Sequence, residues 1–143
     1  MKKKLNRIIL AAILIAVSVY FLFFTAAGSR LDFDETHFSL SFPDGSRYSV
    51  AYNEIVSLEL LDAPDYGSAI DSRNEKGCTF GLWESTSLGL YTRCTLNKIP
   101  SAILLRDTDG SALVFNYQSD SNTRTVFQGF LELLEEKDVI LFS

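Results

Sequence analysis

Residues 102–117, AILLRDTDGSALVFNY, carry the clearest strand signal of this 143-residue sequence. After the acidic turn at residues 107–110, Leu113, Phe115 and Tyr117 alternate with other residues, as side chains on one face of a strand do. An Asp-Gly pair between two apolar runs is typical of a hairpin, because glycine accepts the positive φ of a tight turn. The stretch therefore predicts two antiparallel strands and a mainly β fold.

The same alternation recurs upstream. Residues 38–42 and 48–52 flank the turn Pro43-Asp44-Gly45 and predict a second hairpin. Residues 54–61 predict a further strand, and two more strands flank residues 83–87. The residues expected to face the core on these strands are Phe38, Leu40, Phe42, Tyr48, Val50, Tyr52, Val56, Leu58, Leu60, Cys78, Phe80, Leu82, Leu88, Leu90, Cys94 and Leu96.

Two stretches lack an apolar alternation. Residues 28–36 are short and polar, and we interpret them as a spacer ahead of a domain at residues 37–138. Residues 63–76 contain Pro64 and Gly67 and are interpreted as a long loop, which is usually a solvated connector. The strands predicted on either side of these stretches number seven.

The pattern changes to helical spacing over residues 122–137. Ser119, Asp120 or Ser121 can cap the start of this helix, because their side-chain oxygens accept the free amide protons of the first turn. The apolar residues at three- and four-residue spacing are Val126, Phe127, Phe130, Leu131, Leu133 and Leu134. Seven antiparallel strands are expected to curl into two packed sheets or a partly open barrel, and the helix covers an open end.

An apolar segment precedes the domain. Residues 8–27, IILAAILIAVSVYFLFFTAA, contain no charge, and as a helix they reach about 30 Å, the thickness of the hydrocarbon core of a bilayer. Residues 1–7 are a basic flank. Positive charge is favoured on the cytoplasmic side, so we expect a single-pass membrane helix that leaves the N-terminus in the cytoplasm and the domain outside.

Two other readings of the segment stay open. Small residues at positions 25–27 are compatible with cleavage of a signal peptide, which would secrete the domain. The apolar run is longer than the 7–15 residues usual in a signal-peptide core. In the second reading the domain stays in the cytoplasm against the charge bias.

The charge of the remaining chain excludes some partners. Four of the thirteen basic residues precede the apolar run, which leaves nine against eighteen acidic residues and a formal net charge of −9. An acidic domain repels nucleic acid and anionic headgroups at long range.

The order of elements and several residues resemble the bacterial pleckstrin-homology (PH) domain family over roughly residues 31–135. The residues that carry the resemblance are Gly77, Gly81, Gly89, Tyr91, the run at 102–110, Val114-Phe115-Asn116 and Thr123. The resemblance implies a non-catalytic binding or assembly module, often a homo-oligomer, that follows a membrane helix. It does not extend to a phosphoinositide site, because the loop at residues 42–47 lacks the necessary cluster of Lys and Arg.

Candidate partner-binding residues lie near the only tryptophan. Trp83, Tyr91 and Arg93 share the outward face of their hairpin, and exposed aromatic residues beside arginine are enriched at protein interfaces. Tyr66, in the long loop, is a second candidate. The alternative is that Trp83 covers one end of a barrel. The apolar tail, residues 139–143, is a third candidate surface.

The two cysteines can pair, depending on strand register. If Leu82 opposes Leu90, Cys78 directly opposes Cys94, and a disulfide is possible. If Leu82 opposes Leu88, the thiols are offset and the cysteines are two small buried residues.

Few ingredients of catalysis are present. His37 is the only histidine, so a zinc site is poorly supported, and the sequence has no G-x-S-x-G motif. We expect a non-catalytic, membrane-tethered module for a protein or peptide partner, without a cofactor or metal. Two alternatives remain: an exported hydrolase that uses carboxylates, and a barrel for a small apolar ligand lined by Phe38, Tyr48 and Phe115.

Overall fold

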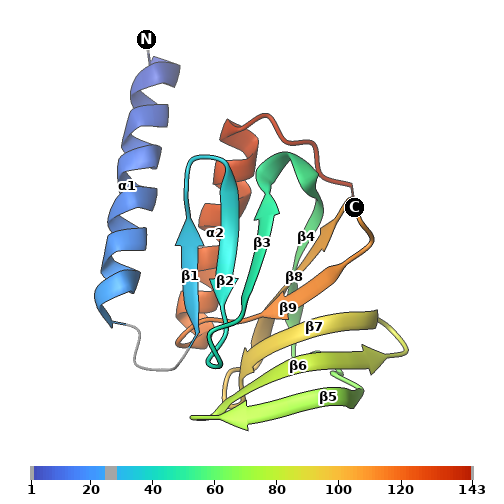
Figure 1. Ribbon diagram of the computed structural model, residues 1–143. Coiled ribbons are helices and arrows are strands. Elements are labelled where there is room, and N and C mark those ends of the chain that lie inside the picture. Colours follow the sequence, from blue (N-terminus) through green and yellow to red (C-terminus); the bar gives the residue numbers. More distant parts are fainter. Residues whose placement is uncertain (1, 25–28, 143) are drawn as a thin grey trace.

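The computed structural model describes residues 2–24 and 29–142, without the side chains of residues 15–24. It contains two β-sheets, a C-terminal helix against them and an N-terminal helix beside them (Figure 1). The elements are α1 (Lys2–Phe24), β1 (Arg30–Phe33), β2 (His37–Ser41), β3 (Arg47–Ala51), a short 3-10 turn (Tyr52–Glu54), β4 (Ile55–Asp62), β5 (Ser68–Glu75), β6 (Cys78–Ser85), β7 (Gly89–Leu96), β8 (Ser101–Asp107), β9 (Ala112–Phe115) and α2 (Asp120–Glu136). The prediction of a mainly β fold with a C-terminal helix is confirmed.

The described residues form nine strands, where the sequence pattern predicted seven. β1, β2 and β3 form an antiparallel three-stranded sheet, and the second sheet has the order β4-β8-β9-β7-β6-β5. The predicted hairpins β2–β3 and β8–β9 are both present.

The expectation of antiparallel strands alone was wrong, because β7 and β9 pair in parallel. β8 pairs with β4 instead of with β7, which leaves a place between β7 and β8 that β9 fills. β7 and β8 run in opposite directions, so β9, which is antiparallel to β8, runs parallel to β7.

The interpretation of residues 28–36 as a spacer was wrong for residues 30–33, which form β1. β1 pairs with β2, with Leu31 opposite Leu40 and Phe33 opposite Phe38. Leu31 is buried, and the Phe33 ring lies 5.0 Å from the ring of Phe130, centroid to centroid. These two apolar residues alternate, but a two-member alternation is too short to stand out in the sequence.

The interpretation of residues 63–76 as a loop was wrong for most of that range. Ser68–Glu75 is β5, an edge strand of the six-stranded sheet, and all of its residues are exposed. A strand that buries neither face needs no apolar alternation, so its sequence carries no strand pattern. Only residues 63–67 connect β4 to β5.

One predicted core face was also shifted. β4 has an irregular register between Ile55 and Ser57, and such a bulge changes which side chains point inward. Ile55 is therefore buried in place of Val56, whereas Leu58 is buried as predicted.

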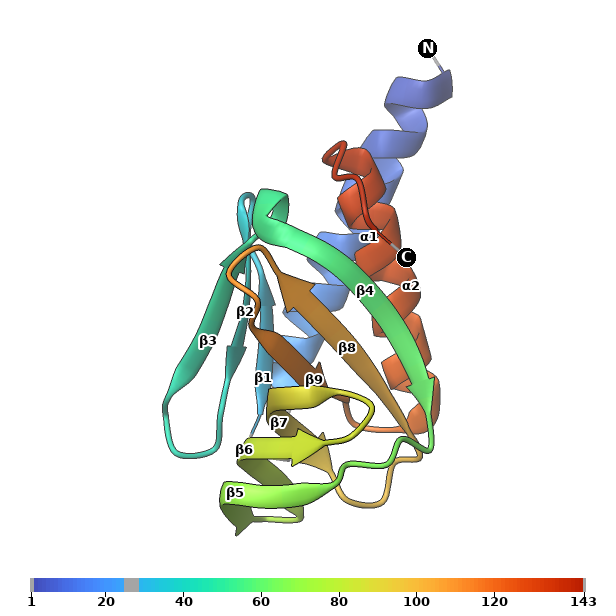
Figure 2. The same cartoon turned by 90° about the vertical axis from the view of Figure 1, so that its right-hand side faces the viewer.

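The main core lies between the two sheets and α2, which runs alongside β4 and β8 (Figure 2). The ring of Phe38 lies 5.3 Å from that of Phe115 and 4.9 Å from that of Phe130, centroid to centroid. The apolar-ligand alternative places Phe38 and Phe115 around an empty interior. In the structure they pack against each other and are fully buried.

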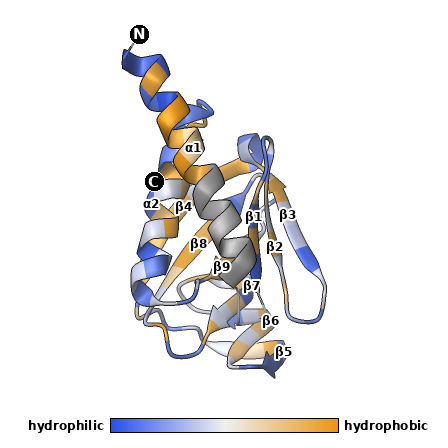
Figure 3. Ribbon diagram, turned by 90° about the vertical axis from the view of Figure 1, so that its left-hand side faces the viewer, coloured by the Kyte–Doolittle hydropathy of each residue, from blue (hydrophilic) through white to orange (hydrophobic). Residues whose placement is uncertain are grey.

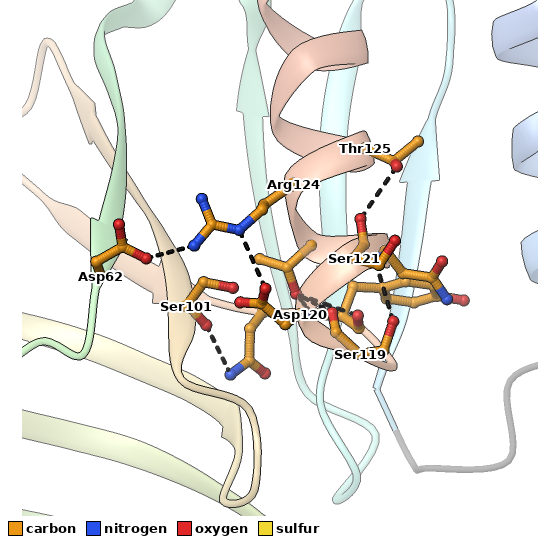
Figure 4. Close-up of polar contacts among 11 residues, drawn as sticks. Asp62, Ser101, Ser119, Asp120, Ser121, Arg124 and Thr125 are labelled. Carbon is orange, nitrogen blue, oxygen red and sulfur yellow. Dashed lines mark hydrogen bonds and ion pairs between the residues drawn. The ribbon is translucent and has the colours of Figure 1, made fainter.

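The C-terminal helix begins at Asp120, two residues before the predicted start. The Ser119 hydroxyl caps it by accepting a hydrogen bond from the amide of Asn122 (3.0 Å). Arg124 forms ion pairs with Asp120 on the same helix and with Asp62 at the end of β4 (Figure 4). These contacts join the start of α2 to the edge of the six-stranded sheet.

The N-terminal helix α1 contacts β1 and α2. Beyond its basic first residues, its described part is apolar (Figure 3), and Ile8, Ile9 and Ile13 are exposed. Among the described residues, no helix is both long and apolar enough to cross a membrane. The predicted membrane segment, residues 8–27, lies partly outside the described residues.

Candidate functional site

A second, smaller apolar cluster lies on the face of the six-stranded sheet that points away from the main core. Its buried members are Tyr91, Ala102, Leu104, Ala112 and Val114, and Leu61, Tyr66, Trp83 and Leu88 pack over them. Tyr91 on β7 lies directly opposite Trp83 on β6. The loop at residues 63–67 brings Tyr66 onto this face, so the cluster is built from the sheet and from a segment distant in sequence.

The structure brings together all four residues that the sequence singled out as a candidate partner surface. The guanidinium carbon of Arg93 lies 3.6 Å from the centroid of the Tyr66 ring and 4.4 Å from that of the Trp83 ring. The hydroxyl of Tyr91 donates a hydrogen bond to the backbone oxygen of Tyr66 (2.6 Å). The Arg93–Tyr66 contact and the Tyr91 hydrogen bond hold the loop against the sheet, and cation–π contacts of this kind are stabilising.

A partner surface requires exposed side chains, and two of these residues are buried. Tyr91 is 1% and Arg93 is 8% exposed, because the loop at residues 63–67 covers the face that was expected to be open. Tyr66 and Trp83 are half-buried, and Trp83 Nε1 donates to the Ser72 hydroxyl (3.1 Å). The period-two spacing of Tyr91 and Arg93 identified the face, but nothing in the sequence indicated its cover.

The polar environment of Arg93 is unusual for a buried cation. Its Nε donates a hydrogen bond to the Thr95 hydroxyl (2.7 Å). Among the described residues, no carboxylate forms an ion pair with Arg93. Burial lowers the pKa of the guanidinium, although it stays charged at neutral pH, and burial raises the pKa of Tyr91 to about 12.

The cysteines adopt neither of the two registers that the sequence suggested. Leu82 opposes Thr92, so that Cys78 opposes Leu96 and Cys94 opposes Phe80. The cysteines are free thiols and buried, yet their sulfur atoms are only 3.8 Å apart on the diagonal between the strands. Hydrogen bonding between them lowers the pKa of Cys78 and raises that of Cys94.

A surface groove of about 390 Å³ lies beside the second cluster. Leu61, Leu88 and Leu104 line it, together with three exposed carboxylates and Arg106. Two of the carboxylates already have partners: Asp62 pairs with Arg124, and Asp65 accepts a hydrogen bond from the amide of Gly67. The third is Glu59.

A larger hollow of about 500 Å³ separates α1 from α2. Leu10, Ile13 and Leu14 line it from α1, and Phe33 and Phe130 line it from the domain. The contact between the N-terminal helix and the domain is therefore incomplete.

The apolar tail is partly docked. The amide of Phe142 donates to the backbone oxygen of Val56 on β4 (2.7 Å), and Val139 and Leu141 pack against the main core. Ile140 and Phe142 are exposed. Half of the third candidate surface is therefore part of the fold.

His37 lies exposed at the start of β2. Its Nδ1 is 2.7 Å from the Thr36 hydroxyl, and its amide donates to a carboxylate oxygen of Asp34 (2.6 Å). In the described part of the chain, no group of three or more His, Cys, Asp or Glu side chains could hold a metal ion.

No protein-family model, curated protein or solved structure matches this chain. The assignment of a function rests on the residues and contacts described above.

Proposed function

We propose that this protein is a non-catalytic interaction module, which α1 tethers to a membrane and which binds a protein or peptide partner through its β domain. The domain has its own core between two sheets and α2. A module of this kind needs no cofactor, and its partner surface is the one around Tyr66 and Trp83.

The observation that carries the proposal is the exposed apolar surface of α1. Residues 8–27 contain no charge, and Ile8, Ile9 and Ile13 are each about half exposed or more, at 60%, 49% and 53%. A helix that is apolar on all sides is stable when protein or lipid surrounds it. Among the described residues, α1 contacts the domain through β1 and α2, and lipid is the natural environment for its exposed isoleucines.

The proposed orientation follows from the basic flank. Residues 1–7 carry four positive charges, which favour the cytoplasmic side, and the acidic domain then lies on the outer face of the membrane. The secreted and cytoplasmic alternatives differ from this orientation in ways that can be measured.

Membership of the bacterial PH domain family is a further part of the proposal. Two sheets followed by a C-terminal helix support it, whereas the parallel pair β7–β9 departs from the antiparallel pattern that the resemblance implies. A homo-oligomer is proposed on the same ground. Phosphoinositide binding is not proposed, because Asp44 in the β2–β3 loop pairs with Arg73 and leaves no cationic cluster there.

The test is extraction of the full chain from cell membranes at alkaline pH, followed by mass measurement. We expect an uncleaved chain in the membrane pellet, with its domain accessible to a protease added outside intact spheroplasts. A soluble chain that keeps residues 1–27 contradicts the tether. Loss of those residues favours secretion, and protection from the protease favours the cytoplasmic alternative.

In the part of the chain that the structure describes, the groove beside Leu88 is the feature that favours a carboxylate-dependent hydrolase. A general acid at neutral pH usually needs a buried carboxyl with a raised pKa, and all three carboxylates of this groove are exposed. Turnover of a glycoside or peptide that is lost in Glu59→Gln, but not in Glu84→Gln, would establish the hydrolase instead.

A further inference from the structure

Arg93 differs from the other arginines of the domain in having a buried charge without a counter-charge. Arg47, Arg73 and Arg124 are exposed, and each forms an ion pair with a carboxylate. Arg93 is 8% exposed and has no such partner among the described residues. The arginine for which pairing matters most is therefore unpaired.

An unpaired buried charge is costly, because it gives up hydration without a compensating ion pair. The rings of Tyr66 and Trp83 offset part of this cost through cation–π contacts. They contact the guanidinium carbon and supply no hydrogen-bond acceptor to its terminal nitrogens.

The terminal nitrogens of Arg93 remain available for a ligand. Among the described residues, Nε alone has a hydrogen-bond partner, the Thr95 hydroxyl, which is itself fully buried. Neither Nη1 nor Nη2 is among the fully buried polar atoms that lack a partner, so both keep contact with solvent. The bond to Thr95 and the two rings fix the orientation of the guanidinium before any ligand arrives.

We propose that Nη1 and Nη2 of Arg93 bind a carboxylate of the partner peptide, beside the rings of Tyr66 and Trp83. A guanidinium presents parallel N–H donors along its edge, and a planar carboxylate accepts two of them at once. The rings lie against the guanidinium carbon, and no acceptor among the described residues occupies the Nη1–Nη2 edge. That the carboxylate belongs to a peptide rests on the proposed function.

The charge of the domain sets how the carboxylate is recognised. With a formal charge of −9 beyond residue 27, the domain does not attract anions at long range. Binding therefore depends on local contacts with Arg93 and the rings, and its association rate is not increased by electrostatic steering.

The single tryptophan of the chain makes the proposal measurable, because Trp83 lies 4.4 Å from the Arg93 guanidinium carbon. The experiment follows Trp83 fluorescence of the full chain in detergent micelles, at constant ionic strength set with chloride. The probes are a short N-acetylated alanine peptide with a free C-terminal carboxylate, the same peptide as its amide, and inorganic phosphate. We expect a saturable change with the carboxylate peptide and none with the amide.

Variants distinguish the contribution of the two parallel N–H donors of Arg93 to binding from that of its positive charge. Arg93→Lys keeps the charge and loses the parallel donors, so binding should weaken about tenfold, the equivalent of one charge-assisted hydrogen bond. Arg106→Lys, in an arginine of the neighbouring groove, is the matched control and should bind as the parent chain does. If Arg93→Lys does not fold, the comparison of acid and amide peptides on the parent chain still decides.

Two results overturn the inference: equal responses to the acid and the amide, or tighter binding of phosphate than of the carboxylate peptide. Neither result bears on membrane extraction of the chain. Conversely, a chain that washes off the membrane can still bind the peptide, so the two proposals fail separately.

Discussion

The sulfur atoms of Cys78 and Cys94 lie 3.8 Å apart, although the residues are two positions out of register across β6 and β7. Diagonal neighbours on one face of an antiparallel pair are within reach of each other, which explains this approach. A disulfide requires a separation of about 2.05 Å, so the sulfurs need to approach by roughly 1.8 Å.

We expect the full chain to form this disulfide when a disulfide reagent, such as oxidised glutathione, accepts the two electrons and becomes two thiols. Cys78 is the attacking group, because hydrogen bonding with Cys94 lowers its pKa and thiolate is the nucleophile. The measurement is thiol titration after denaturation without reductant, which should find no free thiol. Cys94→Ala has no second thiol to displace glutathione, so its Cys78 should remain a mixed disulfide, which mass measurement detects as one added glutathionyl group. A treated parent chain that carries glutathione, or that keeps two free thiols, contradicts the prediction.

Gly81 marks a close approach of β6 to β5. Its φ is +134°, and a Cβ there would overlap the backbone oxygen of Asp71. We expect Gly81→Ala to lower the free energy of unfolding by more than about 3 kcal/mol, because backbone strain and overlap add. Gly110→Ala is the control, since φ is +81° but the space is open, and should cost about 1–2 kcal/mol. Equal costs in chemical denaturation would show that the approach is looser than described.

Asn116 joins three segments through one buried side chain. Its Nδ2 donates to the backbone oxygens of Leu96 and Ser101 (3.2 Å each), and its Oδ1 accepts from the amide of Leu96 (2.7 Å). Asn116→Ala leaves these groups without a partner, which should cost at least about 2 kcal/mol. Asn53→Ala, at an exposed position, should change stability by less than about 0.5 kcal/mol.

The Tyr91 hydroxyl makes stability depend on alkaline pH. Burial raises the pKa of this phenol from its ordinary value of 10.0 to about 12. The stabilisation is complete below pH 10 and is lost as the pH rises through 12, because the unfolded chain releases the proton first. Tyr91→Phe should therefore show a smaller loss of unfolding free energy between pH 10 and 12. A parallel loss in both proteins would place the titration at other buried tyrosines, such as Tyr52 and Tyr117, whose pKa values are also raised.

Parts of the fold were visible in the sequence wherever one face of an element is buried. The hairpin β8–β9 and the helix α2 have apolar residues at fixed spacing, and both were predicted. β5 was missed because it buries neither face, and β1 because only Leu31 and Phe33 alternate. The parallel pairing of β7 with β9 depends on the spatial order of strands, which no local pattern records.

The sequence identified the residues of the candidate site but not their burial. The spacing of Tyr91 and Arg93 placed them on one face, and both are on it. Their burial depends on the loop that carries Tyr66, which comes more than twenty residues earlier. Whether a carboxylate lies next to Arg93 also depends on that loop and on the fold around it. The sequence contains eighteen acidic residues, and it did not indicate that Arg93 would lack a carboxylate partner.

The place of β9 between β7 and β8 has a consequence for biosynthesis. Strand β4 emerges early but finds its neighbour only when β8 is made, and β7 lacks its inner neighbour until β9 follows. The six-stranded sheet cannot be completed in the order of translation, because its middle is the last part to leave the ribosome. A chain delivered from its N-terminus would therefore carry β4 without a partner until β8 ends at residue 107, and β7 with an open inner edge until β9 ends at residue 115. Unpaired strand edges promote aggregation, so this is the interval in which a chaperone would act.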